Sequence, residues 1–199
     1  AVVEEVSLRE DLLKAILPAY YLIANCEATA NHSNLDGIRF GVQQPGESME
    51  EIMIQSRTKG FGSLIRKRFV IGSYGLFVEN QEKLFRQAQR VRRLIVENVA
   101  EVMKDYDILI APASSDVAPK LDDHSRDELS DGYLIAENHM VIGNFTGYPS
   151  CTVPMGMLNG LPIGLNMTAK AWDEQSLFDF AAAMEEITGM KDATAEVME

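Results

Sequence analysis

The sequence has few of the residues on which several common classes of protein depend. It has 2 cysteines in 199 residues, Cys26 and Cys151, and no C-x-x-C pair, so we expect two reduced, apolar side chains and no disulfide scaffold. No apolar run approaches the roughly 18 to 20 residues of a membrane span. With 30 acidic against 18 basic residues, the chain also lacks the cationic excess of a nucleic-acid-binding surface.

Sequence signatures of catalysis are missing as well. The sequence contains no G-x-S-x-G motif, no P-loop and no glycine- or serine-rich loop long enough to form an oxyanion hole. His32, His124 and His139 share no spacing typical of a metal site. Ser114 and Ser115 follow an expected strand, but no base is in evidence near them. We therefore expect no catalytic residue, metal ligand or cofactor site in this chain.

One segment of this acidic chain contains no acid. From Ile52 to Val78 there is no Asp or Glu, yet five cations occur, namely Arg57, Lys59, Arg66, Lys67 and Arg68. Arg68 is distinctive because the residues three and four positions away on its predicted helix are all apolar or glycine. Two interpretations are open. Arg68 pairs with a distant acid or extends to solvent, or it grips the carboxylate of a ligand with two parallel hydrogen bonds.

The first half of the chain has mainly helical patterns. We expect a helix over residues 7–17 with Ser7 as its N-cap, and a second helix that begins at Pro18. A turn at residues 36–41 should follow. Ser48 and Glu51 form a capping box before a short helix that ends at Gly60. Further helices are expected from about residue 63 and over residues 81–104.

Strand patterns appear in the second half. Residues 106–112 predict a buried strand, residues 113–132 an exposed loop, and residues 151–155 and 162–169 a hairpin around Asn159 and Gly160. Asp173 and Gly189 should cap the last helix. Helices followed by separated strands predict an α/β chain. Since three strands make a thin sheet, we expect further strands to lie outside this sequence.

Several of these stretches, in this order, resemble the amidase signature family. They include "PAYYLIANCEATANHSNLDGIRFG", "GFGSLIRKRFVIGSYGL", "GNFTGYPSCTVPMG" and "NGLPIGLNMTAKAWDEQSL". The first two together are similar to the glutaminase subunits of tRNA-dependent glutamyl/aspartyl amidotransferases. The resemblance implies the C-terminal portion of a mixed sheet flanked by helices. Residues 1–190 would form part of one domain, and residues 191–199 a disordered tail.

The resemblance also implies a role for three residues. Arg68 would hold the α-carboxylate of bound glutamine, Tyr20 would line the same pocket, and Glu137 would bind the amino group where the family commonly has Asp. One cation and one anion together would fix the orientation of an amino-acid zwitterion. The family's catalytic serines and lysine lie in a stretch that this sequence lacks, so we expect the chain alone to be inactive.

The whole protein implied by the resemblance would hydrolyse glutamine and release ammonia. Its partners, the B and C subunits, would use that ammonia, with ATP and Mg, to convert Glu-tRNA(Gln) or Asp-tRNA(Asn) into Gln-tRNA(Gln) or Asn-tRNA(Asn). Charged tRNA would bind mainly to the partner subunits of a cytoplasmic complex, with no membrane contact. Two alternatives remain: another amidase-signature hydrolase acting on small amides, and a non-catalytic interaction module.

Overall fold

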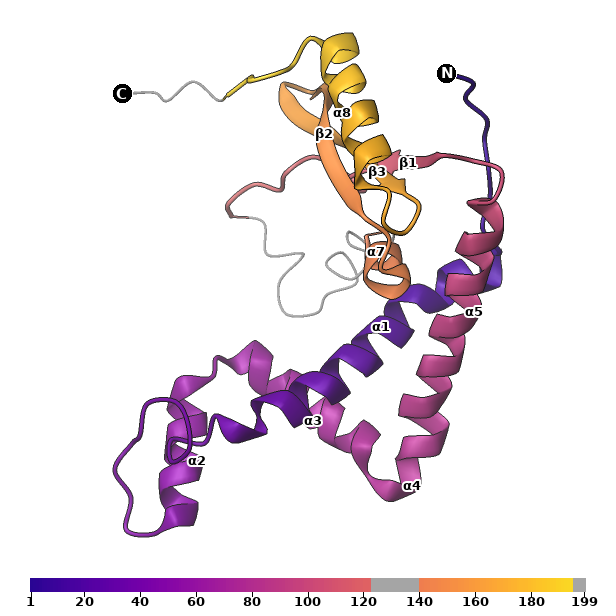
Figure 1. The fold of residues 1–199 in the computed structure, drawn as a ribbon. Helices are drawn as coiled ribbons and strands as arrows, with labels where there is room; N and C mark the ends of the chain where they lie inside the picture. The colour runs from indigo at the N-terminus through magenta and orange to yellow at the C-terminus, as the bar shows by residue number, and fades with distance from the viewer. Residues whose placement is uncertain (123–139, 195–199) are drawn as a thin grey trace, which may run out of the picture. The chain divides into compact units, whose positions relative to one another are not determined.

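The computed structural model describes residues 1–122 and 140–194 (Figure 1). The chain divides into two compact units. Residues 1–17 and 93–199 form one unit, which contains every described strand and is called the sheet unit below. Residues 18–92 form the other, called the helical unit. The expectation that residues 1–190 belong to one domain stays a prediction.

The sheet unit is built on three antiparallel strands in the order β1-β3-β2. They are β1 (Ile108–Pro112), β2 (Ser150–Leu158) and β3 (Leu161–Ala169). The predicted hairpin turn is confirmed, because Asn159 and Gly160 join β2 to β3 with φ angles of 52° and 80°. The pairing of β2 with β3 shifts between Pro154 and Gly156, as expected for a bulge at a residue without an N–H.

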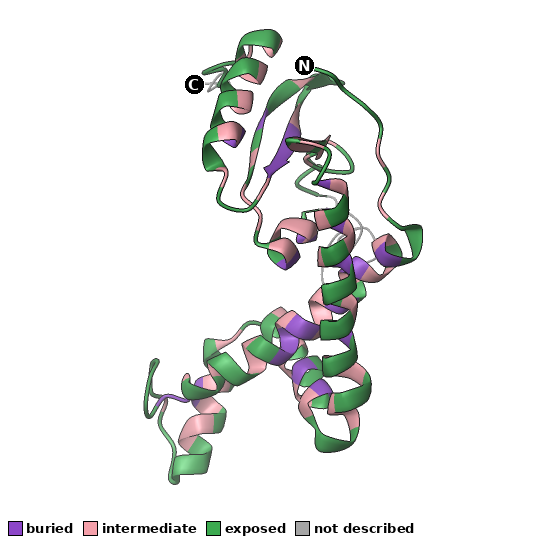
Figure 2. Ribbon diagram, turned by 45° about the vertical axis from the view of Figure 1, so that its right-hand side comes forward, coloured by how far each residue is buried: buried purple, intermediate pink, exposed green. Residues whose placement is uncertain are grey.

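One face of this sheet is covered by helix α8 (Glu174–Thr188), which lies along β2 and β3 (Figure 1). The buried core between them consists of Val153, Leu165, Met167, Ala169 and Leu177. The second half of β3 is buried throughout (Figure 2). Both predicted caps of α8 are confirmed, since the amide of Ser176 donates to Asp173 and Gly189 adopts a left-handed φ of 65°.

Strand β1 was predicted to be buried, and that prediction is wrong. Ile110, in the middle of this strand, is 45% exposed. Within the described residues, β1 pairs with β3 alone and is therefore an edge strand. A short helix, α7 (Val141–Thr146), precedes β2 and was not predicted.

The helical unit contains most of the helices. Wholly within it lie η1 (His32–Asn34), α2 (Met49–Gly60), α3 (Ser63–Leu76), α4 (Val78–Gln81) and the π-helical η2 (Glu82–Arg86). It also contains the part of α1 (Glu10–Asn31) from Pro18 onward and the part of α5 (Gln87–Val102) up to Arg92. The division between the two units falls inside α1 and inside α5. No helix of the described ranges is long and apolar enough to span a bilayer.

Two helix predictions are wrong in detail. Pro18 does not begin a second helix but lies inside α1, which starts at Glu10, so Ser7 is not its N-cap. A proline removes a single backbone hydrogen bond, and burial of Ile16, Ala19 and other apolar residues on both sides of it outweighs that loss. The long helix expected over residues 81–104 is real but is interrupted by the π-helical turn η2.

Within the helical unit, α1 and α3 approach each other closely at two glycines of α3. A Cβ atom at Gly72 would lie 2.1 Å from the carbonyl oxygen of Asn25, and one at Gly75 would lie 2.7 Å from Sγ of Cys26. The hydroxyl of Thr29 donates to the Asn25 carbonyl at 2.7 Å and lies 3.4 Å from that of Phe69. Backbone therefore meets backbone at this crossing, which only glycine allows.

We expect Gly72→Ala to destabilise the chain by at least about 1–3 kcal/mol, because its methyl group would meet a backbone carbonyl that cannot rotate away. Urea unfolding measures the change. Gly60→Ala, at the end of α2 with nothing within 4 Å of the added Cβ, is the matched control and should leave stability nearly unchanged. Equal effects of the two substitutions would show that the crossing is not tightly packed.

Candidate functional site

Two of the three predicted site residues lie in the helical unit, close to the α1–α3 crossing. Arg68 is half-buried on α3, and its Nε atom is enclosed by protein. Its guanidinium carbon lies over the ring of Tyr21 on α1, 5.7 Å from the ring centroid. The rings of Tyr20 and Tyr21 meet edge to face, with centroids 5.6 Å apart. The structure therefore gathers Arg68 and the tyrosine pair into one cluster.

The third predicted residue, Glu137, lies outside the described residues. Its proposed contact with an amino group stays a prediction. Tyr21 is the residue that the sequence interpretation missed. The signal for it was the tyrosine pair itself, but neighbouring helix residues point about 100° apart, and the sequence does not say which of the two faces α3.

The cluster combines a cation with aromatic rings, and its chemistry is that of binding. A guanidinium offers coplanar N–H groups that match the two oxygens of a carboxylate. A tyrosine ring offers a flat apolar surface and a hydroxyl group. The described residues hold no group of three or more His, Cys, Asp or Glu side chains able to bind a metal ion.

Arg57, another cation of the acid-free segment, contacts backbone carbonyls and aromatic rings. Its Nη1 atom donates to the carbonyl oxygens of His32 at 2.8 Å and Leu35 at 3.1 Å. Its guanidinium carbon lies 5.1 Å from the ring centroids of both Phe61 and Phe69. This one side chain therefore ties η1, α2 and α3 together, and Phe69 is the residue next to Arg68 in α3.

The turn after η1 is held by a buried carboxylate. The side chain of Asp36 is 2% exposed and accepts hydrogen bonds from the backbone amides of Arg39 and Ile38 and from the Arg39 guanidinium. The hydrogen bond from the backbone amide of Arg39, followed by that from Ile38, contributes most to lowering the pKa of Asp36 from 3.8 to about 2. Gly37 follows with φ +78° and contacts Ser56 of α2 so closely that no Cβ would fit. The predicted turn is confirmed.

The capping box of α2 is confirmed in part. The amide of Glu51 donates to Oγ of Ser48 at 3.1 Å, as predicted. In a capping box the Glu51 carboxylate would accept a hydrogen bond from the amide of Ser48. Here it accepts one from the amide of Glu47, the preceding residue.

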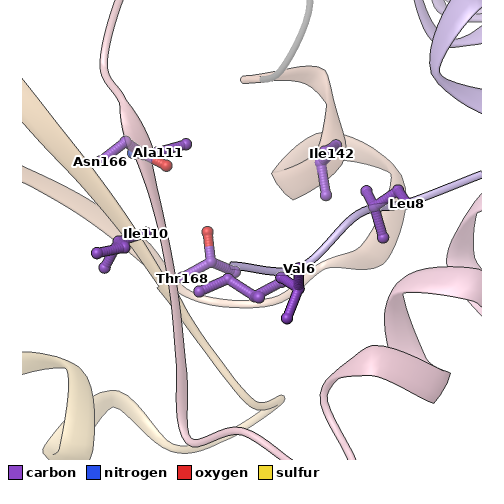
Figure 3. A pocket seen from close by; sticks show the side chains of 8 residues that line it. Val6, Leu8, Ile110, Ala111, Ile142, Asn166 and Thr168 are labelled. Carbon is purple, nitrogen blue, oxygen red and sulfur yellow. The ribbon is translucent and has the colours of Figure 1, made fainter. Parts of the chain in front are cut away.

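The sheet unit has a cavity of its own on the sheet face that carries Asn166 and Thr168 (Figure 3). Its lining is mainly apolar and includes Val6, Leu8 and Ile142. Its volume is about 150 Å³, below the roughly 300–1,000 Å³ typical of ligand sites. The amide of Asn166 donates to Cys151 and Thr152 within the sheet. No predicted site residue lines this cavity, so we place the candidate site at the α1–α3 crossing.

Comparison with solved structures identifies the class of fold. The chain is similar to a protein described as "Crystal structure of amidase", with a TM-score of 0.70 and 18% identity over 95% of this chain and 38% of that one. The Amidase family profile matches residues 1–178, and the chain belongs to that family. The predicted fold class, part of an amidase-signature α/β fold, is confirmed.

Curated relatives give a narrower likeness, to the A subunits of glutamyl-tRNA(Gln) amidotransferases. The A subunit from Latilactobacillus sakei subsp. sakei is 33% identical over 94% of this chain and 38% of its own length. The protein of the same name from Roseiflexus castenholzii is 36% identical over 92% of this chain and 37% of its own. The chain therefore spans less than two-fifths of the length of these relatives.

The low pKa of Asp36 predicts how acid acts on the helical unit. Because the folded pKa is about 2 and the ordinary value is 3.8, the ionised carboxylate stabilises the fold fully above pH 4, and this contribution is lost as the pH falls towards 2. Asp36→Asn should therefore lower the free energy of unfolding most above pH 4, and the difference from wild type should shrink between pH 4 and 2.

Urea unfolding of both proteins at pH 2 to 6 measures this difference. Glu186→Gln removes one negative charge from an exposed position of α8 and controls for the change in net charge. A difference between wild type and Asp36→Asn that is constant over this pH range would contradict the assignment.

Proposed function

We propose that this chain is the C-terminal part of a glutaminase subunit that supplies ammonia to a tRNA-dependent amidotransferase. Support comes from the relatives that carry the name of such a subunit, which align with over nine-tenths of the chain. The observation that carries the proposal is the cluster at the α1–α3 crossing, where a half-buried arginine lies over one tyrosine ring of a pair.

In this proposal Arg68 binds the α-carboxylate of glutamine through two charge-assisted hydrogen bonds, Tyr20 lines the pocket, and Glu137 binds the amino group. The serine nucleophile and its activating groups would belong to the part of the whole protein that lies outside this chain. Attack by that serine on the glutamine amide would give an acyl-enzyme and ammonia, and water would then release glutamate. The role of this chain in the reaction would be to bind and orient the substrate.

The partners proposed are the B and C subunits of a cytoplasmic heterotrimer. They would bind ATP and Mg and most of the charged tRNA, and would use the ammonia for amide formation on Glu-tRNA(Gln) or Asp-tRNA(Asn). The net charge of −12 on this chain is consistent with tRNA contacts that lie mainly elsewhere.

The test is ammonia release from glutamine by the whole protein that contains this chain, purified alone and with candidate partner subunits. Release that rises with partners and charged tRNA would support the amidotransferase. Hydrolysis of unrelated small amides with no response to partners would assign the protein to another class of amidases. The 199-residue chain by itself should release no ammonia.

Arg68→Ala in the whole protein should lower kcat/KM for glutamine by about 30- to 1,000-fold, mainly through KM, since roughly 2–4 kcal/mol of charge-assisted bonding is lost. Steady-state kinetics with glutamine measure this change. Arg66→Ala, an exposed arginine two residues earlier in the same helix, is the matched control and should leave KM unchanged. Unchanged kinetics of Arg68→Ala would remove Arg68 from the pocket.

A further inference from the structure

The ring of Tyr21 lies against the one cation that the proposed function needs. Arg68 has a long side chain, and the rotational freedom that it loses when it is immobilised opposes binding. A group that holds the guanidinium before the ligand arrives removes part of that cost. The ring of Tyr21, 5.7 Å from the guanidinium carbon, is within the range of a cation–π contact.

The geometry of a guanidinium allows a ring and a carboxylate to bind it at once. A ring attracts the cation through the face of its π system. A carboxylate is gripped by coplanar N–H groups at the edge of the guanidinium. A ring under Arg68 therefore orients the fork without occupying the edge that a carboxylate would use.

Tyr21 is itself held from two sides. The edge-to-face contact with Tyr20 restricts its ring, with an interplanar angle of 76°. Its backbone is fixed by the crossing one turn later, where the carbonyl of Asn25 meets Gly72 of α3. Tyr21 and Asn25 are four residues apart on α1, as Arg68 and Gly72 are on α3. The contact of Tyr21 with Arg68 and that of Asn25 with Gly72 therefore occupy adjacent turns of both helices.

We propose that Tyr21 is a positioning residue that orients the Arg68 guanidinium for the carboxylate of an amino-acid substrate. This inference rests on the proposed function. Tyr21 acts through Arg68 and need not touch the substrate, in contrast to the role proposed for Tyr20. Its contribution is to substrate affinity and not to the chemical step.

Glutamine kinetics of the whole protein, with its partners where they are needed, test this role. Tyr21→Leu keeps apolar bulk but removes the ring, and should raise KM about tenfold with kcat nearly unchanged. Tyr21→Phe keeps the ring and should remain within about twofold of wild type. In an Arg68→Ala background, Tyr21→Leu should have no further effect on KM, because the group that it positions is gone.

The outcomes separate this inference from the proposed function. A raised KM in Arg68→Ala with an unchanged KM in Tyr21→Leu would overturn the role of Tyr21 and leave the glutaminase standing. A Tyr21→Phe variant as impaired as Tyr21→Leu would also overturn it, since the hydroxyl and not the ring face would then matter. An unchanged KM in both Arg68→Ala and Tyr21→Leu would overturn the site itself.

A second measurement covers the case in which Tyr21→Leu does not fold. In the wild-type chain and in Tyr21→Phe, NMR should show the side-chain protons of Arg68 shifted upfield by the ring. The shift should persist when the exposed Arg66 is replaced by alanine. Absence of an upfield shift in the wild type would overturn the proposal.

Discussion

The close approach of α1 to α3 is the constraint on which the candidate site depends. At Gly72 the two helices are so near that a single methyl group would lie 2.1 Å from a carbonyl oxygen. Side chains on the neighbouring turns are then brought within contact distance. Arg68 and Tyr21 meet for that reason, although they lie far apart in sequence. The sulfhydryl of Cys26 adds a contact to the Gly72 carbonyl at 3.5 Å, and burial raises the pKa of this thiol, so it remains a protonated donor at neutral pH.

A second set of contacts fixes the surroundings of that crossing. Arg57 joins the carbonyls of His32 and Leu35 to the rings of Phe61 and Phe69, which belong to successive parts of the chain. The carboxylate of Asp36 closes the intervening turn. Each of these contacts is charge-assisted or involves a cation and a ring, and each lies within the helical unit. The position of Arg68 thus depends on polar contacts as well as on apolar packing.

Features set by a few neighbouring residues could be predicted from the sequence. The caps at Ser48 and Asp173, the turn at Asn159 and Gly160, and the start of α3 at Ser63 are of this kind, and all are confirmed. Pro18 was misplaced because the local rule for proline competes with burial of residues on both sides, which a local pattern does not weigh. The exposure of β1 depends on which strands lie beside it, which its own apolar composition does not specify.

The site was predictable only to the level of the helix. Arg68 could be identified from the absence of acids around it, and the tyrosine pair from the resemblance to a family. Which tyrosine meets the guanidinium depends on the rotation of α1 against α3, and that rotation is set by glycines in a distant part of the sequence. A periodic pattern identifies the apolar face of one helix, but it does not say how that helix is rotated about its axis relative to another helix.

The absence of Asp and Glu from residues 52–78 bears on the carboxylate site proposed at Arg68. A carboxylate side chain fixed beside the guanidinium would compete directly with a carboxylate ligand, because both need the same N–H groups. A ring is a weaker partner, worth roughly 0.5–2 kcal/mol, and it uses a different surface of the cation. The ring of Tyr21 can therefore orient the Arg68 guanidinium through its face and leave its edge to the carboxylate of the proposed substrate.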